Sequence, residues 1–157
     1  MAKPIPDGYP QLSPYICIDG ADAAIEFYSS VFGAKERMRM PSPGGKIGHA
    51  ELQLGDSLIM LSDEYPEMGS RSPKSVGGTP VTLSMYVDDV DDVFARALGA
   101  GAKELRPVET QFYGDRMGLL EDPFGHRWSI ASHVEDVPAE EMGRRAAEAM
   151  GGGSAGA

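Results

Sequence analysis

His49 and Glu51 are the residues of this sequence whose types and spacing are best suited to chemistry. They stand two apart in the alternating stretch "GHAELQL" (48–54), and side chains two apart on a strand share one face. A carboxylate close to an imidazole orients the ring and stabilises its protonated form, which suits general acid–base work near neutral pH. The pair could also supply two ligands to a divalent metal, or be a polar pair at the rim of a sheet without any function. The residues themselves leave these three interpretations open.

Two arginines are candidates for holding an anionic group. Arg116 follows "QFYGD", and Arg127 opens the alternating stretch "RWSIASH" (127–133) with its side chain on the polar side. A guanidinium can bind a carboxylate or phosphonate through two parallel hydrogen bonds. The alternative is that each arginine pairs with a nearby acid, such as Asp115 or Glu121 for Arg116, and stabilises a turn.

Aromatic side chains would form the walls of such a site. Tyr15 and Tyr86 occupy nearly equivalent places in two similar stretches, and Tyr113 lies close to Arg116. Aromatic walls suit a flat or apolar ligand, whereas the alternative for the first two is packing where the two halves of the chain join. Trp128 points to the opposite side by parity and is expected in the core.

The remaining cysteine and histidines are expected to be structural. Cys17 has no helix N-terminus or basic neighbour in view, so a buried, inert thiol is the expectation. His126 lies in the turn Asp122–His126, where Pro123 and Gly125 favour a tight, structural turn, and His133 ends a strand.

The elements that must position these residues are short strands and two helices. Apolar residues at three-and-four spacing predict helices over 22–32 and 90–98, with Asp22 and Gly33 as cap signals of the first. Alternating polarity predicts strands over four stretches, with one apolar face each: 12–18, 48–54, 81–87 and 127–133. The other face is mixed and carries tyrosine, methionine and leucine, so we expect a curved sheet that encloses a ligand-sized cleft.

The sequence contains an internal repeat. Residues 16–35 resemble residues 85–103: Asp19 matches Asp88 at an offset of 69 (88 − 19), and both stretches end in Gly-Ala-Lys. A period of this length is too long for a solenoid repeat and too short for two independent domains. We therefore expect an α+β fold of two βαβββ modules, with this organisation: a first module over 10–65, a linker over 66–80, a second module over 81–135, and a C-terminal helix and flexible tail over 136–157.

Charge, apolar runs and cysteine content indicate which partners and which cellular location to expect. The net charge of −10 argues against nucleic acid and anionic membrane surfaces, both of which require a basic footprint. No apolar run approaches the roughly 20 residues that cross a bilayer, and the first ten residues do not form a secretory signal. A single cysteine cannot form an intramolecular disulfide, so a reducing, cytoplasmic location is expected.

The duplicated βαβββ pattern resembles the vicinal-oxygen-chelate superfamily of glyoxalases, bleomycin-resistance proteins and dioxygenases. Three stretches resemble its PhnB-like branch, over residues 10 to 135 or so: "GHAELQLGDSLIMLSDE", "QFYGDRMG" and "EDPFGHRWSIASH". The resemblance implies the glyoxalase/bleomycin-resistance fold, a small-molecule ligand and a homodimer. It says little about activity, because one scaffold carries several chemistries.

In the metal-dependent members, the early residue of each module's first strand and the middle residue of its last strand bind a divalent cation through His, Gln or Glu. Carried onto this chain, these positions are Ser13, Met60, Thr82 and Ser129. Hydroxyl and thioether groups are poor ligands for the metals concerned. We therefore expect no metal and no other cofactor, and we count Met60, Thr82 and Ser129 among the ligand-binding residues instead.

Two functions follow as hypotheses. The first is a metal-independent protein of the bleomycin-resistance type, which binds a small molecule in the cleft. The alternative is a lyase or isomerase with His49 and Glu51 as acid and base and an arginine as anion clamp, with a displaced divalent metal at that pair as a further variant.

Overall fold

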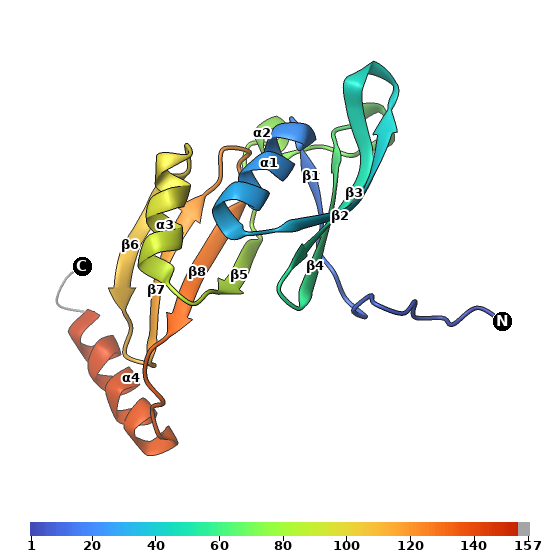
Figure 1. Ribbon diagram of the computed structural model, residues 1–157. Coiled ribbons are helices and arrows are strands. Elements are labelled where there is room, and N and C mark those ends of the chain that lie inside the picture. The colour runs from blue at the N-terminus through green and yellow to red at the C-terminus, as the bar shows by residue number, and fades with distance from the viewer. Residues whose placement is uncertain (154–157) are drawn as a thin grey trace. The chain divides into compact units, whose positions relative to one another are not determined.

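Two compact units make up the computed structural model, which describes residues 1–153 (Figure 1). The first unit contains residues 1–81 and residues 122–126, and the second contains residues 82–121 and those from 127 onward. The linker expected over residues 66–80 therefore groups with the first unit.

The first unit is built on a four-stranded mixed sheet with one helix against it (Figure 1). Its strands lie in the order β1-β4-β3-β2, where β1 and β4 are parallel and the other neighbours are antiparallel. The elements are β1 (Tyr15–Ile18), α1 (Ala21–Phe32), β2 (Lys35–Ser42), β3 (Lys46–Leu54) and β4 (Ser57–Asp63), followed by the short helix α2 (Pro73–Val76).

The second unit repeats this plan with the strand order β5-β8-β7-β6. Here β5 and β8 are the parallel pair. The elements are β5 (Thr82–Tyr86), α3 (Val90–Gly99), β6 (Lys103–Thr110), β7 (Asp115–Glu121), β8 (Arg127–His133) and α4 (Ala139–Gly153). The predicted α+β fold of two βαβββ modules is thus confirmed, with a separate mixed sheet in each module.

Each helix covers one face of its sheet. In the first unit, side chains of one strand parity pack under α1 and are almost fully buried, among them Ile16, Ala50, Leu52 and Leu61. Burying a leucine or isoleucine side chain stabilises the fold by about 1.5–3 kcal/mol. The opposite parity forms the face that α1 does not cover, and we call it the uncovered face of the first sheet.

A carboxylate from β4, rather than Asp22, caps α1. Asp63 accepts hydrogen bonds from the backbone N–H groups of Gly20 and Ala21 at 3.2 and 2.9 Å, and from Ile47 at 2.7 Å. Asp22 lies within the first turn and forms an ion pair with Arg39 at 2.6 Å. The sequence pattern failed here because the capping group is distant in the chain. At the other end, Gly33 adopts the left-handed conformation (φ 76°) expected of a helix stop.

The turn Asp122–His126 belongs to the first unit, although its sequence neighbours are strands of the second. The Tyr28 hydroxyl donates a hydrogen bond to Asp122, whose other oxygen accepts from the backbone N–H groups of Phe124 and His126. Phe124 packs edge-on against Tyr28, with ring centroids 6.3 Å apart. These contacts agree with the structural role expected for this turn.

Helix α4 runs from Ala139 to Gly153, so the first three glycines of the expected flexible tail complete the helix, and residues 154–157 lie outside the described part. Arg145 of α4 bonds to Glu135 at 2.8 Å and to the backbone oxygen of Phe112 at 3.2 Å. Among residues 1–153, no helix has the length and apolarity needed to span a bilayer.

Candidate functional site

A chain of hydrogen-bonded side chains lies on the uncovered face of the first sheet. His49 Nε2 lies 2.9 Å from Glu51 Oε2, and His49 Nδ1 lies 2.9 Å from the Tyr15 hydroxyl. The two residues of β3 meet because they are two apart on one strand, as strand parity predicts. Tyr15 joins them from β1 across β4, where its backbone neighbour is Met60, which pairs in turn with Glu51. The sequence proposed His49 and Glu51 as a pair but did not connect them to Tyr15.

Glu51 is the buried end of this row of hydrogen-bonded side chains, with 5% of its surface exposed. Its second oxygen accepts a hydrogen bond of 2.7 Å from the hydroxyl of Tyr9. The hydrogen bond from His49 and the one from Tyr9 hold the pKa of Glu51 below its usual value, against the opposing effect of burial. The same carboxylate raises the pKa of the Tyr9 phenol. Glu51 is therefore a carboxylate whose two oxygens are both in use.

Tyr9 is a site residue that sequence reasoning missed. It lies in the irregular segment before β1, where no periodic pattern points to a face. The Arg37 guanidinium stacks over its ring at 4.8 Å and donates a hydrogen bond of 2.9 Å to the backbone oxygen of Gly8. This contact with β2 holds the segment against the sheet. The only sequence signal was an aromatic residue within a proline-rich stretch.

Methionines and Tyr15 supply the apolar part of the same face. Tyr15 is 54% exposed and Met40 51% exposed, while Met38 and Met60 are half-buried. Ladder pairing aligns Met38 with Glu51 and Met40 with His49. The polar chain thus lies among flexible thioether side chains, which adapt to ligands of irregular shape.

Cys17 lies on this face at the end of β1. Its thiol is half-buried and lies 3.3 Å from the Ser70 hydroxyl, and burial raises the pKa of the thiol. A raised pKa disfavours the thiolate, which agrees with the inert role expected for Cys17.

The second sheet carries different residues at the matching places. In the first sheet Tyr15 pairs with Met60. In the second sheet the residue that matches Met60 is Ser129, and its ladder partner is Ser84. Thr82 pairs instead with Arg127. Tyr86 pairs with Ala131, one step further along the strand. The place equivalent to Tyr15 is therefore Ser84, and the near equivalence of Tyr15 and Tyr86 expected from sequence is off by two residues.

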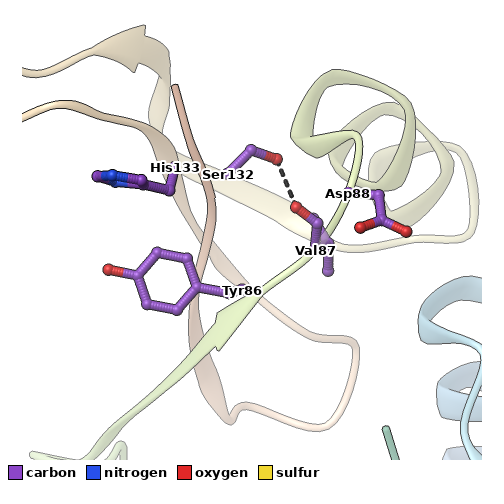
Figure 2. Close-up of a pocket in the computed structure, with 5 residues that line it drawn as sticks. All are labelled: Tyr86, Val87, Asp88, Ser132 and His133. Carbon is purple, nitrogen blue, oxygen red and sulfur yellow. Dashed lines mark hydrogen bonds between the residues drawn. The ribbon is translucent and has the colours of Figure 1, made fainter. Parts of the chain in front are cut away.

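A pocket of ≈ 370 Å³ opens at the carboxyl ends of the parallel strands β5 and β8. Figure 2 shows its lining, with the Tyr86 ring and the His133 imidazole on one side and the Asp88 carboxylate on the other. The Ser132 hydroxyl donates to the backbone oxygen of Val87 at 2.6 Å, so it is occupied within the fold.

Asp115 of β7 links the two rings of this pocket. It accepts hydrogen bonds from the Tyr86 hydroxyl at 2.6 Å and from His133 Nδ1 at 2.8 Å, while His133 Nε2 lies 2.7 Å from Asp136. Asp115, and after it Asp136, raise the pKa of His133, and the Tyr86 hydroxyl lowers the pKa of Asp115. His133, which the sequence suggested was only a strand-end residue, is therefore part of a polar cluster with Tyr86, Asp115 and Asp136. Strand parity alone does not predict this cluster.

Arg116 and Tyr113 are placed away from this pocket's lining. Arg116 has the strand parity of Gly118, which packs against Phe94 of α3, and its guanidinium binds both oxygens of Asp91 at 2.8 and 2.9 Å. The guanidinium of Arg116 is thus paired with Asp91 on the helix side of the sheet, whereas the sequence offered Asp115 or Glu121 as its partner. Tyr113 donates to the Met117 sulfur at 3.0 Å. Arg127 remains on the uncovered side of the second sheet, half-buried and paired in the ladder with Thr82 and Glu121.

The residues at the superfamily's metal positions do not fit a divalent cation. They are a thioether and three hydroxyls, and Ser13 precedes β1 because Pro14 has no N–H to continue the ladder. Within residues 1–153, no three His, Cys, Asp or Glu side chains are grouped so as to hold a metal ion.

Comparisons of the sequence and of the fold with known proteins point to the same family. The model of the Glyoxalase/Bleomycin resistance protein/Dioxygenase superfamily matches residues 11–130. The uncharacterized protein Rv0887c of Mycobacterium tuberculosis is 46% identical over 136 residues, which are 85% of this chain and 80% of that protein. The crystal structure of TioX from Micromonospora sp. ML1 is 29% identical with a TM-score of 0.63, covering 80% of this chain and 99% of TioX. A PhnB protein from Bacillus cereus, 18% identical over 78% of this chain and 99% of its own, shares the fold with a TM-score of 0.63.

Proposed function

Because the chain belongs to the glyoxalase/bleomycin resistance/dioxygenase superfamily, we propose that it binds a small organic molecule on the uncovered face of the first sheet, without the superfamily's divalent metal. The observation that carries the proposal is the exposed Tyr15 ring, hydrogen-bonded to His49 and set among methionines.

The chemistry of this face favours a flat, partly apolar ligand. An aromatic ring and polarizable thioethers bind such a ligand by dispersion and stacking, and the Tyr15 hydroxyl, held by His49, gives one polar anchor. Small-molecule sites in proteins have this composition, with an apolar lining and a few fixed polar groups.

The donor set supports metal independence. Binding through Met60, Ser129, Thr82 and Ser13 would require weak neutral ligands for a hard or borderline cation. Elemental analysis of protein purified without chelator or metal-affinity resin tests this directly. We expect no stoichiometric metal, and one equivalent of zinc, nickel, manganese or iron would contradict it.

Binding itself can be tested with a library of small aromatic compounds and ligand-observed NMR. We expect binders to the wild-type protein whose signals are lost in Tyr15→Ala. The matched control is Tyr65→Phe, which removes a buried hydroxyl that has no hydrogen-bond partner among the described residues. If binding were unchanged in Tyr15→Ala, the uncovered face of the first sheet would be excluded as the binding site.

A second candidate is a lyase or isomerase, favoured by the 2.9 Å hydrogen bond between His49 and Glu51. Such a pair can shuttle a proton without a metal. In that case Glu51→Gln is expected to abolish turnover of a bound compound while sparing its binding. Turnover that survives in both Glu51→Gln and His49→Gln would exclude the pair as acid and base.

We also propose a homodimer in a reducing, cytoplasmic location. The exposed Tyr86 ring supports association, since aromatic residues are enriched at protein interfaces, and the free thiol of Cys17 agrees with reducing conditions. Native mass spectrometry measures the oligomeric state, and a monomer at micromolar concentration would exclude the dimer.

A further inference from the structure

The hydrogen bonds around His49 fix which atoms carry protons. An ionised carboxylate only accepts hydrogen bonds, so Glu51 must receive the Nε2–H of His49. In the neutral ring the other nitrogen, Nδ1, then has a lone pair and no hydrogen. The Tyr15 hydroxyl, 2.9 Å away, must therefore donate its hydrogen to Nδ1.

This arrangement leaves no free nitrogen on His49 for a ligand. Both ring nitrogens are engaged, and the side chain is 23% exposed. Tyr15, in contrast, is 54% exposed, and its oxygen keeps lone pairs after donating its only hydrogen. The polar atom offered to a ligand is the Tyr15 oxygen, and it can only accept.

We propose that Tyr15, rather than His49, exchanges a proton with the bound molecule, and that this molecule is a flat weak acid whose ionisable hydrogen is on oxygen. The inference rests on the proposed binding at the uncovered face of the first sheet. An O–H group is selected because it donates a short, strong hydrogen bond to a phenol oxygen.

The proton transfer balances between the ligand and two side chains, Tyr15 and His49. The ligand's O–H bond breaks and its proton forms a new O–H bond on Tyr15, while the original Tyr15 proton moves to His49 Nδ1. The products are a ligand anion, a neutral Tyr15 and an imidazolium, and no electrons change owner. Glu51, already ionised and 5% exposed, stabilises the imidazolium through a charge-assisted hydrogen bond.

Tyr9 acts as a positioning residue in this scheme. Its 2.7 Å hydrogen bond occupies the second oxygen of Glu51, so the carboxylate faces His49 with the first. Such support of an orienting carboxylate is a common feature of relays in which one side chain acts through another.

The probe for the test is 4-nitrophenol, a flat weak acid whose phenolate absorbs visible light and whose phenol does not. Near the probe's own pKa, we expect binding to wild-type protein to increase the phenolate fraction. In His49→Gln and Tyr15→Phe, the apparent pKa of the bound probe should rise by one unit or more, about a tenfold change in the ionisation equilibrium. Tyr65→Phe, the matched loss of a hydroxyl outside the face, should behave as wild type.

The outcomes separate the inference from the proposed function. If 4-nitrophenol binds but its ionisation is the same in wild type, His49→Gln and Tyr15→Phe, the relay is wrong and binding stands. If neither the probe nor any library compound binds, the proposed function fails. Nitrogen-15 NMR of His49 gives an independent check that needs no ligand: the neutral ring should carry hydrogen on Nε2, and hydrogen on Nδ1 would overturn the assignment.

Discussion

Buried carboxylates organise both polar clusters at the scale of single residues. Glu51 accepts from His49 and Tyr9, and Asp115 accepts from His133 and Tyr86, so each module holds one histidine and one tyrosine on a carboxylate. The order of the groups differs. In the first module the second imidazole nitrogen bonds to a further tyrosine, Tyr15, whereas in the second module it bonds to Asp136. This difference is why the relay is assigned to the first sheet.

Replacing Glu51 with Gln should destabilise the protein in a pH-dependent way. Loss of the charged acceptor weakens two partly buried hydrogen bonds, and we expect a cost of about 1–3 kcal/mol in the free energy of unfolding at neutral pH. Because folding lowers the pKa of Glu51, its contribution is present above the unfolded pKa and is lost as the pH falls through the folded pKa. Urea unfolding of both proteins from pH 7 down to pH 3 measures this. The exposed Glu67→Gln is the control, and a constant difference at all pH values would contradict the argument.

The two carboxylates bound to His133 should contribute unequally to its pKa. Asp115 is largely buried, whereas Asp136 is fully exposed and screened by water. We expect the raised pKa of His133 to fall further in Asp115→Asn than in Asp136→Asn, as measured by proton NMR of the imidazole. The pH dependence of stability is opposite to that of Glu51, because folding raises the pKa of His133. The contribution of His133 to the free energy of unfolding is complete below the unfolded pKa and is lost as the pH rises through the folded pKa. Equal shifts in the two variants would show that burial does not decide the effect.

At the scale of helices and strands, the close packing of α3 on its sheet depends on a glycine. Gly118 in β7 lies under α3, and a Cβ atom there would lie 2.7 Å from the Phe94 ring and 2.9 Å from the Val108 side chain. Contacts this short require the helix or the ring to shift. The absence of a side chain at position 118 therefore lets α3 approach its sheet.

Gly118→Ala should accordingly destabilise the protein by about 1–3 kcal/mol, the usual cost of overpacking a core. Gly143→Ala is the matched control, since position 143 lies in α4 with nothing within 4 Å of the added Cβ. Replacing glycine by alanine in an open helix position should stabilise by up to about 1 kcal/mol. Thermal unfolding of the two variants compares them, and a Gly118→Ala protein as stable as wild type would contradict the packing argument.

The whole molecule reflects a duplication whose two halves kept their fold and diverged in their side chains. The fold was predictable because helix and strand periodicities are local and the repeat doubled the signal. Strand parity also predicted the contact of His49 with Glu51. Residues outside the regular elements were not predictable: Tyr9 lies in an irregular segment, and Asp63 caps a helix more than forty residues away in the chain. The pairing of Arg116 with Asp91 was also not predictable, because the two residues are 25 positions apart and no local pattern joins them.

The most direct test of metal-independent binding at the first sheet uses the nine methionines of the chain as reporters. Protein labelled with carbon-13 at the methionine methyl groups is titrated with 4-nitrophenol, with and without a chelator. We predict saturable shifts of Met38, Met40 and Met60, identical in both conditions, while the exposed Met68 and Met150 stay unchanged. Shifts that spare these three methionines, or that require a divalent metal, would contradict the proposed function.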